Sequence, residues 1–184
     1  MTTSAPDKEL LEGCRAGNRK AQERLYRDYY RSMAALCLRY TGNDADAVEA
    51  LNNGFLKVFR NIGRYDAAQG SLYTWIRTIV LHSCLDYIKV RQRQESADEL
   101  EDAPEAHIPA DAVSRMQASE LLALVRRLPP ATAAVFNLYV LEGCTHREIA
   151  TLLDISEGTS KWHLAAARKQ LQLLIQQENM HYHE

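Results

Sequence analysis

The sequence predicts an all-α protein made of two small helical domains joined by an acidic flexible linker, with a helix-turn-helix in the second domain. Apolar residues recur at three- and four-residue spacing along most of the chain, and no alternating stretch is long enough to predict a strand. This periodicity stops over one acidic segment near the middle. With 184 residues, 46% of them hydrophobic, the chain can bury two small cores.

The first domain is predicted to cover residues 1–93 and to contain four helices. We expect a short helix over residues 7–16, a longer one from Asn18 to Thr41, a third from Asn43 to near Gly63, and a fourth that begins at Ser71. Asn and Ser cap the first turn of a helix, and Gly is common just after the last turn. The residues of the third helix expected to face the core are Val48, Leu51, Phe55, Leu56 and Phe59.

The acidic linker is predicted over residues 94–111. Seven acidic residues and no Lys or Arg lie between Glu95 and Asp111, and Pro104 and Pro109 would interrupt a helix. Because the whole chain carries a net charge of −2, the segments outside this stretch sum to +5. Both domains can therefore be basic enough to bind nucleic acid despite the overall charge.

The second domain, predicted over residues 112–184, contains the spacing of a helix-turn-helix at residues 145–164. Ala150 is small enough for two helices to cross closely, Ile155 would fill the corner, and Ser156 would cap the second helix so that its first turn can enter a major groove. The residues of that helix expected to face the core are Ser160, Leu164, Ala167 and Leu171. An ordinary helical hairpin without a ligand would show the same spacing.

Residues 128–169, with the motifs REIA at 147–150 and ISEGT at 155–159, closely resemble the region-four domain of extracytoplasmic-function (ECF) sigma factors. In that family the second helix of the helix-turn-helix reads the upstream promoter element. Asp154 stands where the family usually has Gly, although Asp tolerates the left-handed backbone that a sharp turn can require. Trp162 lies against DNA in one interpretation and packs on the preceding helix in the other.

The resemblance implies a set of residues that bind the upstream element. They are Thr145, His146, Glu157, Thr159, Lys161, Trp162, Ala165, Arg168 and Lys169. Relatives often carry larger or basic side chains at the position of Ala165, so this chain has fewer contacts available.

Residues 7–93 resemble region two of the same family, through FLKVFR at 55–60 and through the fourth helix. Opening a duplex requires a pocket for an unstacked base and cations along the displaced strand. The loop at 65–71 offers an aromatic ring, hydrogen-bonding groups and a glycine where the family is expected to capture a flipped base. Trp75, in the helix that follows, has the spacing of a core residue. The implied downstream-element residues are Tyr65, Asp66, Gln69, Ser71, Arg77, His82, Lys89, Arg91 and Arg93.

The family meets a coiled coil of the large polymerase subunit through its second and third helices. Asp46 and Glu49 match the acidic pattern of that surface, while Asn52 and Asn53 stand where Gln followed by an acid is usual. The resemblance implies core RNA polymerase and promoter DNA, both duplex and single-stranded, as partners. It also implies an inhibitory anti-sigma factor.

We therefore predict a sigma factor that directs core RNA polymerase to specific promoters and initiates DNA-templated transcription. A stand-alone helix-turn-helix regulator that does not act through polymerase would explain only residues 128–175. An interaction module without a DNA role is the third class, and salt-insensitive or absent DNA binding would favour it.

Neither enzyme chemistry nor a cofactor is predicted. The histidines lack metal-ligand spacing with the cysteines, and no phosphate-binding loop or nucleophile elbow is visible, so we expect no metal. Without a CxxC pair, the four cysteines are expected to be reduced and mostly packed. The absence of a long apolar run and of a secretion signal predicts no direct membrane insertion and a cytoplasmic location.

Overall fold

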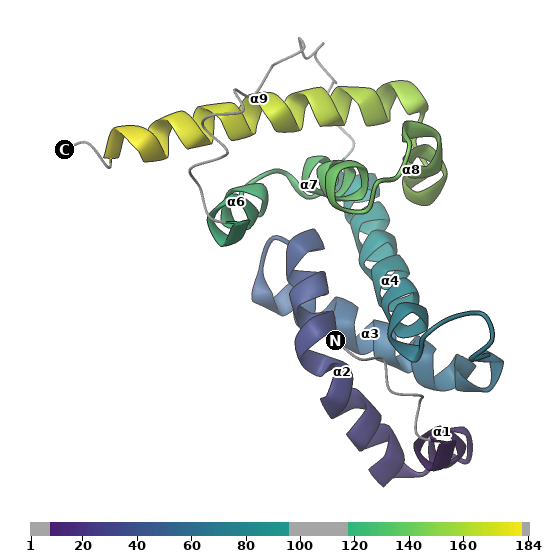
Figure 1. Cartoon of the computed structure of the whole chain (residues 1–184). Coiled ribbons are helices and arrows are strands. Elements are labelled where there is room, and N and C mark those ends of the chain that lie inside the picture. The colour runs from purple at the N-terminus through teal and green to yellow at the C-terminus, as the bar shows by residue number, and fades with distance from the viewer. Residues whose placement is uncertain (1–7, 96–117, 182–184) are drawn as a thin grey trace. The chain divides into compact units, whose positions relative to one another are not determined.

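The computed structural model describes residues 8–95 and 118–181, and all regular secondary structure within them is helical (Figure 1). The prediction of an all-α protein is confirmed. The chain divides into two compact units, Met1–Leu38 with Asn43–Cys84 and Arg39–Gly42 with Leu85–Glu184. Residues 94 and 95 continue a helix, and the rest of the predicted linker lies outside the described residues, so the boundaries 1–93, 94–111 and 112–184 stay predictions.

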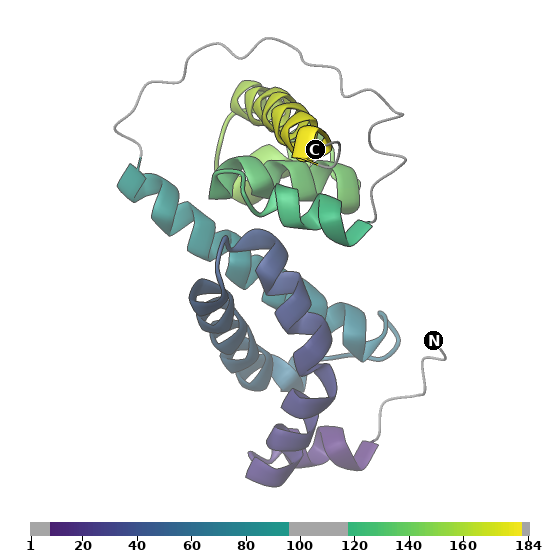
Figure 2. The same cartoon turned by 90° about the vertical axis from the view of Figure 1, so that its left-hand side faces the viewer.

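The N-terminal helices begin where the sequence predicts them. They are α1 (Lys8–Arg15), α2 (Arg19–Tyr40), α3 (Asp44–Asn61) with the short 3-10 helix η1 (Ile62–Arg64), and α4 (Leu72–Glu95). The connection from η1 forms a loop at the N-terminal end of α4 (Figures 1 and 2).

Side-chain caps explain these starting points. The amide groups of Lys20 and Ala21 donate to Asn18 Oδ1 at 2.9 and 3.3 Å, and the amide of Thr74 donates to Ser71 Oγ at 3.1 Å. Asn43 caps α3 in the same way, by accepting from the amide of Asp46. Each cap satisfies an amide that has no partner within its own helix.

The buried face of α3 differs from the predicted one. Val48 and Leu56, expected to point inward, are 49% and 52% exposed, and Phe59 is half-buried. Leu51 and Phe55 are buried as predicted, and the structure buries with them a set of mostly small residues, namely Ala47, Ala50, Gly54 and Val58. Small residues let two helix backbones approach closely, and that gain outweighs the greater hydrophobicity of the alternative face.

Gly54 marks a close approach of α3 to α4. A Cβ atom added at Gly54 would lie 3.0 Å from Val80 Cγ2 and 3.2 Å from Val80 Cα. The absence of a side chain at this position therefore fixes the distance between the two helices.

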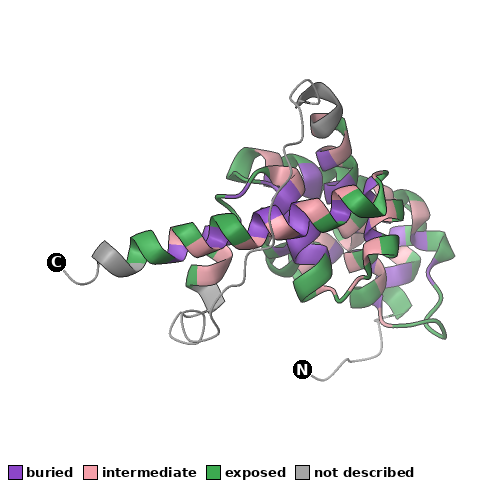
Figure 3. Ribbon diagram, turned by 90° about the horizontal axis from the view of Figure 1, so that it is seen from above, coloured by how far each residue is buried: buried purple, intermediate pink, exposed green. Residues whose placement is uncertain are grey.

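The C-terminal unit is built around one long helix. Besides residues 39–42 and the C-terminal part of α4, it contains α6 (Ala118–Val125), α7 (Pro130–Phe136) continued by the π-helical turn η2 (Asn137–Leu141), α8 (His146–Leu153) and α9 (Glu157–His181). Buried residues recur along α9 as a stripe, visible in Figure 3. The four residues predicted to face the core from α9, Ser160, Leu164, Ala167 and Leu171, are all buried, which confirms that prediction.

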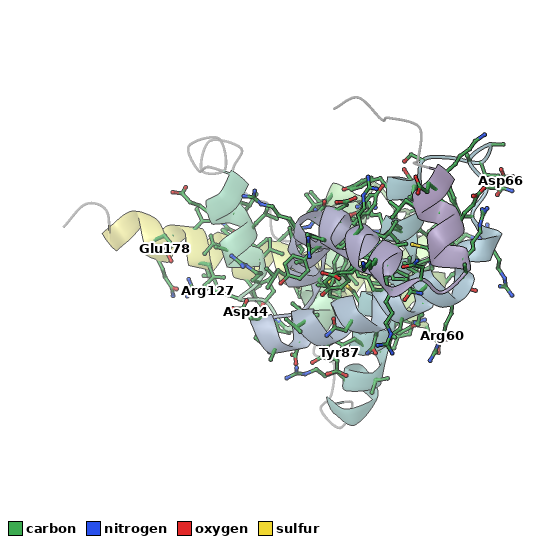
Figure 4. The ribbon with its side chains drawn as sticks, turned by 90° about the horizontal axis from the view of Figure 1, so that it is seen from below. Asp44, Arg60, Asp66, Tyr87, Arg127 and Glu178 are labelled. Carbon is green, nitrogen blue, oxygen red and sulfur yellow. The ribbon has the colours of Figure 1, made fainter. Side chains whose placement is uncertain are left out.

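Two contacts tie α9 to the earlier helices of its unit. Arg127, just after α6, forms a 3.0 Å ion pair with Glu178 of α9 (Figure 4). Deeper in the unit, Thr132 Oγ1 of α7 and His163 Nδ1 of α9 lie 3.1 Å apart, and both residues are buried. The exposed ion pair contributes little to stability. The Thr132–His163 contact is buried, so a change at it should alter the free energy of unfolding.

The Gly54 contact predicts a steric penalty. Gly54→Leu should lower the free energy of unfolding by about 1–3 kcal/mol, because the new side chain meets the backbone of Val80. Gly63→Leu is the matched control, since a Cβ at Gly63 has no neighbour within 4 Å. Urea unfolding followed by Trp75 fluorescence, in a Trp162→Phe background, measures both variants. Equal effects of the two substitutions would contradict the proposed close contact.

His163 predicts a pH dependence of stability. Burial lowers the pKa of its imidazole from 6.5 to about 4, so the unfolded chain takes up a proton in this range before the folded chain does. Above about pH 6.5 the imidazole is neutral in both states, so the lowered pKa takes nothing from the free energy of unfolding. As the pH falls toward 4, the unfolded chain is protonated and the free energy of unfolding decreases by up to about 3 kcal/mol. His163→Asn keeps a polar atom for Thr132 and cannot titrate, so its unfolding free energy should fall less steeply over this range. Parallel pH curves for the variant and the original protein would rule out the effect.

Candidate nucleic-acid interface

A pocket of about 260 Å³ opens between the loop at 65–71 and the first turns of α4. The four predicted loop residues Tyr65, Asp66, Gln69 and Ser71 all line it, so the structure brings together the residues that sequence analysis assigned to base capture. Gly70, the glycine of the predicted loop, also lines the pocket. Sequence analysis did not assign the remaining lining residues to it, which are Arg64, Thr74, Trp75, Thr78 and Ile79.

Tyr65 holds the loop in place. Only 6% of the residue is exposed, and its hydroxyl donates to the carbonyl of Gly70 at 3.1 Å, across the loop. Its own carbonyl accepts from the Arg15 guanidinium of α1 at 3.3 Å. Tyr65 is therefore a wall of the pocket, with its hydroxyl engaged within the fold.

Trp75 supplies the second aromatic wall. The spacing of Trp75 favoured the core, but the residue is half-buried, lines the pocket and places its ring centroid 5.6 Å from that of Tyr65. The exposed part of an indole ring is a surface on which a base can stack. Trp75 lies three residues after the buried Leu72. Core and pocket residues of α4 share this spacing, so the sequence pattern does not show that Trp75 lines a pocket.

The rim of the pocket is shaped by Asp66. Its carboxylate accepts from the Ala68 amide at 2.9 Å and from Gln69 Nε2 at 3.3 Å, and the residue lies on the outer part of the loop (Figure 4). Gly70 closes the loop with a φ of 153°, a backbone conformation that favours glycine. Both polar rim side chains, Asp66 and Gln69, are exposed and can reach a ligand.

The predicted DNA-binding residues of α4 do not share one face. His82 lies four residues after the pocket residue Thr78 and is exposed, so it continues the pocket face. Arg77 and Arg91 lie at seven-residue spacing from the buried Cys84, on a different stripe, and Arg91 donates to the Tyr87 hydroxyl at 2.9 Å.

Two predicted residues remain at the far end of α4. Lys89 is half-buried, seven residues beyond His82, and so lies near the pocket face. The side chain of Arg93 lies outside the described residues.

Local hydrogen bonds form the helix-turn-helix. Thr145 and Glu148 make a reciprocal capping box at the start of α8, and these hydrogen bonds lower the pKa of the Glu148 carboxyl. Asp154 ends α8 in the left-handed conformation, with φ 59° and ψ 46°, and Ser156 Oγ accepts from the Thr159 amide at 2.9 Å to start α9. The predicted left-handed turn at Asp154 and helix cap at Ser156 are confirmed.

His146 joins the two helices of the motif. Its Nδ1 lies 2.9 Å from Ser160 Oγ of α9, and its ring stacks on Tyr139 of η2 with the centroids 4.8 Å apart. Partial burial, followed by the charge of Lys161, lowers the pKa of His146, so the neutral ring is favoured. Thr145 and His146, predicted to bind DNA, thus have structural partners, and DNA contact by either stays a prediction.

The outer face of α9 carries most of the remaining upstream residues. Lys161 and Lys169 are exposed, Arg168 is half-buried, and Glu157 in the first turn adds one exposed acid. The other predicted residues, Thr159, Trp162 and Ala165, are half-buried. Trp162 places its ring edge against His163 at a centroid distance of 4.9 Å.

The outer face of α3 carries the predicted polymerase-binding residues. Glu49, Asn52 and Asn53 are exposed, next in the helix to the exposed Val48 and Leu56. Apolar side chains at a polar surface are typical of protein interfaces. The sequence analysis missed Val48 and Leu56 because it assigned them to the core.

Other residues fix the edges of this surface. Asp46 accepts from Asn43 Nδ2 at 2.7 Å, which places its carboxylate within the cap of α3. Tyr26 of α2 donates its hydroxyl to Asn52 Oδ1 at 3.4 Å, and its ring lies 4.6 Å from that of Phe55.

Within residues 8–95 and 118–181, no three His, Cys, Asp or Glu side chains are grouped so that they could hold a metal ion. Among the helices of the same residues, none combines the length and apolar character needed for a membrane span.

Comparisons with known proteins address both units. Residues 25–94 match the family model of sigma-70 region 2, and residues 118–171 match that of sigma-70 region 4. The chain is 31% identical over 172 residues to the ECF RNA polymerase sigma factor SigM of Mycobacterium tuberculosis, covering 92% of this chain and 84% of the relative. It is 25% identical over 188 residues to the ECF RNA polymerase sigma-E factor of Haemophilus influenzae, covering 96% and 98%.

A structure of the sigma factor RpoE in complex with the anti-sigma factor NepR from Bartonella quintana has a TM-score of 0.48 and 15% identity, covering 84% of this chain and 96% of that one. The family assignment rests on the sequence matches, which fall on both units and, for SigM, extend over nearly the whole chain. This chain belongs to the sigma-70 family of RNA polymerase sigma factors, in its ECF group.

Proposed function

We propose that this sigma factor, which directs RNA polymerase to promoters, reads a promoter at two separate places. The pocket at the loop 65–71 captures an unstacked base of the downstream element, and the outer face of α9 reads the duplex of the upstream element. The observation that carries the proposal is the pocket, where polar loop residues and the Trp75 ring converge. The assignment of residues 1–93 to the first role and 112–184 to the second is part of the proposal.

The chemistry of the pocket suits a nucleobase. Stacking on an aromatic ring contributes roughly 1–3 kcal/mol per base, which is comparable to the few kcal/mol that unstacking costs. The Asp66 carboxylate accepts hydrogen bonds from a base, while the Gln69 amide both donates and accepts. Capture of one base can therefore bias strand opening without an energy source.

Positive charge supports both contacts. Lys89 lies near the pocket face of α4 and supplies positive charge for the displaced strand, and His82 on that face offers a hydrogen-bonding ring. On α9, Lys161, Arg168 and Lys169 supply phosphate contacts, and each neutralised phosphate adds to the salt dependence of binding.

Partner binding completes the proposed role. The exposed face of α3, with Glu49, Asn52, Asn53 and the apolar Val48 and Leu56, is the proposed contact for core polymerase. An anti-sigma factor is the inhibitory partner that family membership supports. We further propose that the chain has no catalytic chemistry of its own and works in the cytoplasm.

The alternative of a stand-alone helix-turn-helix regulator is disfavoured. It leaves the N-terminal pocket without a role, and the family matches include region 2 as well as region 4. The two functions differ in one measurable respect, because a sigma factor requires core polymerase for promoter-specific initiation.

Substitutions in the pocket and on α9 should have different effects on a template whose downstream element is already unpaired. With core polymerase and a promoter selected from genomic fragments for dependence on this chain, Gln69→Ala should slow open-complex formation roughly 3- to 10-fold, by loss of about 1 kcal/mol of hydrogen bonding. The defect should shrink when the downstream element is already unpaired. Lys161→Ala should weaken binding to both templates alike and reduce the salt dependence by about one phosphate contact. Abortive initiation rates measure both effects.

Gln176→Ala is the matched control, since Gln176 is an exposed residue of α9 outside both proposed sites. Equal defects of Gln69→Ala on paired and pre-melted templates would contradict base capture. Specific DNA binding by the chain, without any initiation when core polymerase is added, would favour the stand-alone regulator.

A further inference from the structure

Two buried cysteines from different helices meet in the N-terminal unit. Cys37 of α2 and Cys84 of α4 place their sulfur atoms 3.5 Å apart, and neither residue has any exposed surface. No disulfide joins them in this structure. The promoter-reading role described above uses neither thiol.

The other two cysteines have different surroundings. Cys14 lies on α1, and Cys144 lies in the turn before α8, in the other unit. Oxidation chemistry that needs two neighbouring thiols is supported at Cys37 and Cys84 by the short distance between their sulfur atoms.

We propose that Cys37 and Cys84 form a reversible disulfide when the protein meets a peroxide, so that the pair is a redox-responsive cross-link between α2 and α4. A sulfur–sulfur bond measures about 2.05 Å, so the two atoms must approach by about 1.5 Å, which side-chain rotation and a small helix shift supply. The cross-link closes a long segment that includes the whole of α3, and closing a long segment restrains the unfolded chain.

The chemistry balances with hydrogen peroxide as the oxidant. One thiol, as its thiolate, attacks a peroxide oxygen; the O–O bond breaks, a sulfenic acid forms, and the released hydroxide takes up the thiol proton as water. The second sulfur then attacks the sulfenic sulfur, the S–O bond breaks, and a second water leaves. Two thiols are oxidised to one disulfide while one peroxide is reduced to two waters. A dithiol reductant reverses the change by exchange.

The burial of both thiols limits the rate of their oxidation, and their position on α2 and α4 determines what the cross-link moves. Because both sulfurs are fully buried, a peroxide reaches them only through local opening of the helices, so the response follows sustained oxidation. Cys84 lies on the same helix as the pocket residues Trp75 and Thr78. A cross-link that shifts α4 against α2 therefore also moves one wall of the pocket.

Peptide mapping of the full-length chain tests the proposal directly. The reduced protein is treated with hydrogen peroxide, remaining thiols are alkylated, and trypsin is added without reductant. The expected product is a cross-linked pair of the peptides 32–39 and 78–89, which contain Cys37 and Cys84, and dithiothreitol should separate them. The same treatment of the urea-unfolded chain is the proximity control and should give much less of this pair.

A cysteine series adds a second readout. In the Cys14→Ala/Cys144→Ala double variant, oxidation should still remove both remaining thiols and raise the midpoint of thermal unfolding by several degrees. In a Cys37→Ala/Cys84→Ala double variant, oxidation should leave the midpoint unchanged. Should the core substitutions unfold that variant, the peptide map of the original protein still decides the question.

Either of two results would overturn the proposal. Cys37 and Cys84 could both stay open to alkylation after unfolding of the peroxide-treated protein, or they could be converted only to separate sulfinic or sulfonic acids. Cross-links confined to Cys14 or Cys144 would count against it in the same way.

Discussion

Tyr65 is the residue on which the pocket depends. Its hydroxyl binds the carbonyl of Gly70 at the far end of the loop, its ring lies beside Trp75, and its carbonyl is held by Arg15 of α1. A loop that carries exposed polar side chains would otherwise sample many conformations, and each would cost entropy to fix on binding. With both ends fixed, Asp66 and Gln69 project from a defined frame beside an aromatic wall.

Helix α3 also positions the pocket, through one of its two faces. Its small residues, above all Gly54, let α4 approach and so place the pocket wall that Trp75 provides. The opposite face exposes Glu49, Val48 and Leu56, which form part of the proposed contact for core polymerase. One helix thereby links the position of the pocket to that proposed contact. We expect polymerase docking at α3 and base capture beside α4, both proposed above, to reinforce each other.

Sequence analysis succeeded wherever the signal is local. Asn18, Ser71 and Ser156 cap helices because a short polar side chain can reach an amide two or three residues on, and this requires no knowledge of the rest of the fold. The left-handed turn at Asp154 was predictable for the same reason. The buried stripe of α9 followed from its clear periodicity.

The errors and omissions arise where tertiary contacts decide. Hydrophobicity favoured Val48 and Leu56 for the core of α3, but the close approach of α4 selects the face with Gly54 instead. Trp75 satisfied the core spacing while lining a pocket. The structural contact of His146 was missed, because its partner Ser160 comes from another helix and is invisible to local patterns.

We propose that the pocket holds an unpaired base of the downstream element when core polymerase is bound at the promoter. A photo-crosslinking amino acid at Gln69, with the full chain, core polymerase and a chain-dependent promoter, detects that contact. We expect a cross-link to one unpaired base within the downstream element, formed only when core polymerase is present. Normal initiation with a cross-link to paired DNA, or with none on the promoter, would rule out base capture by the pocket.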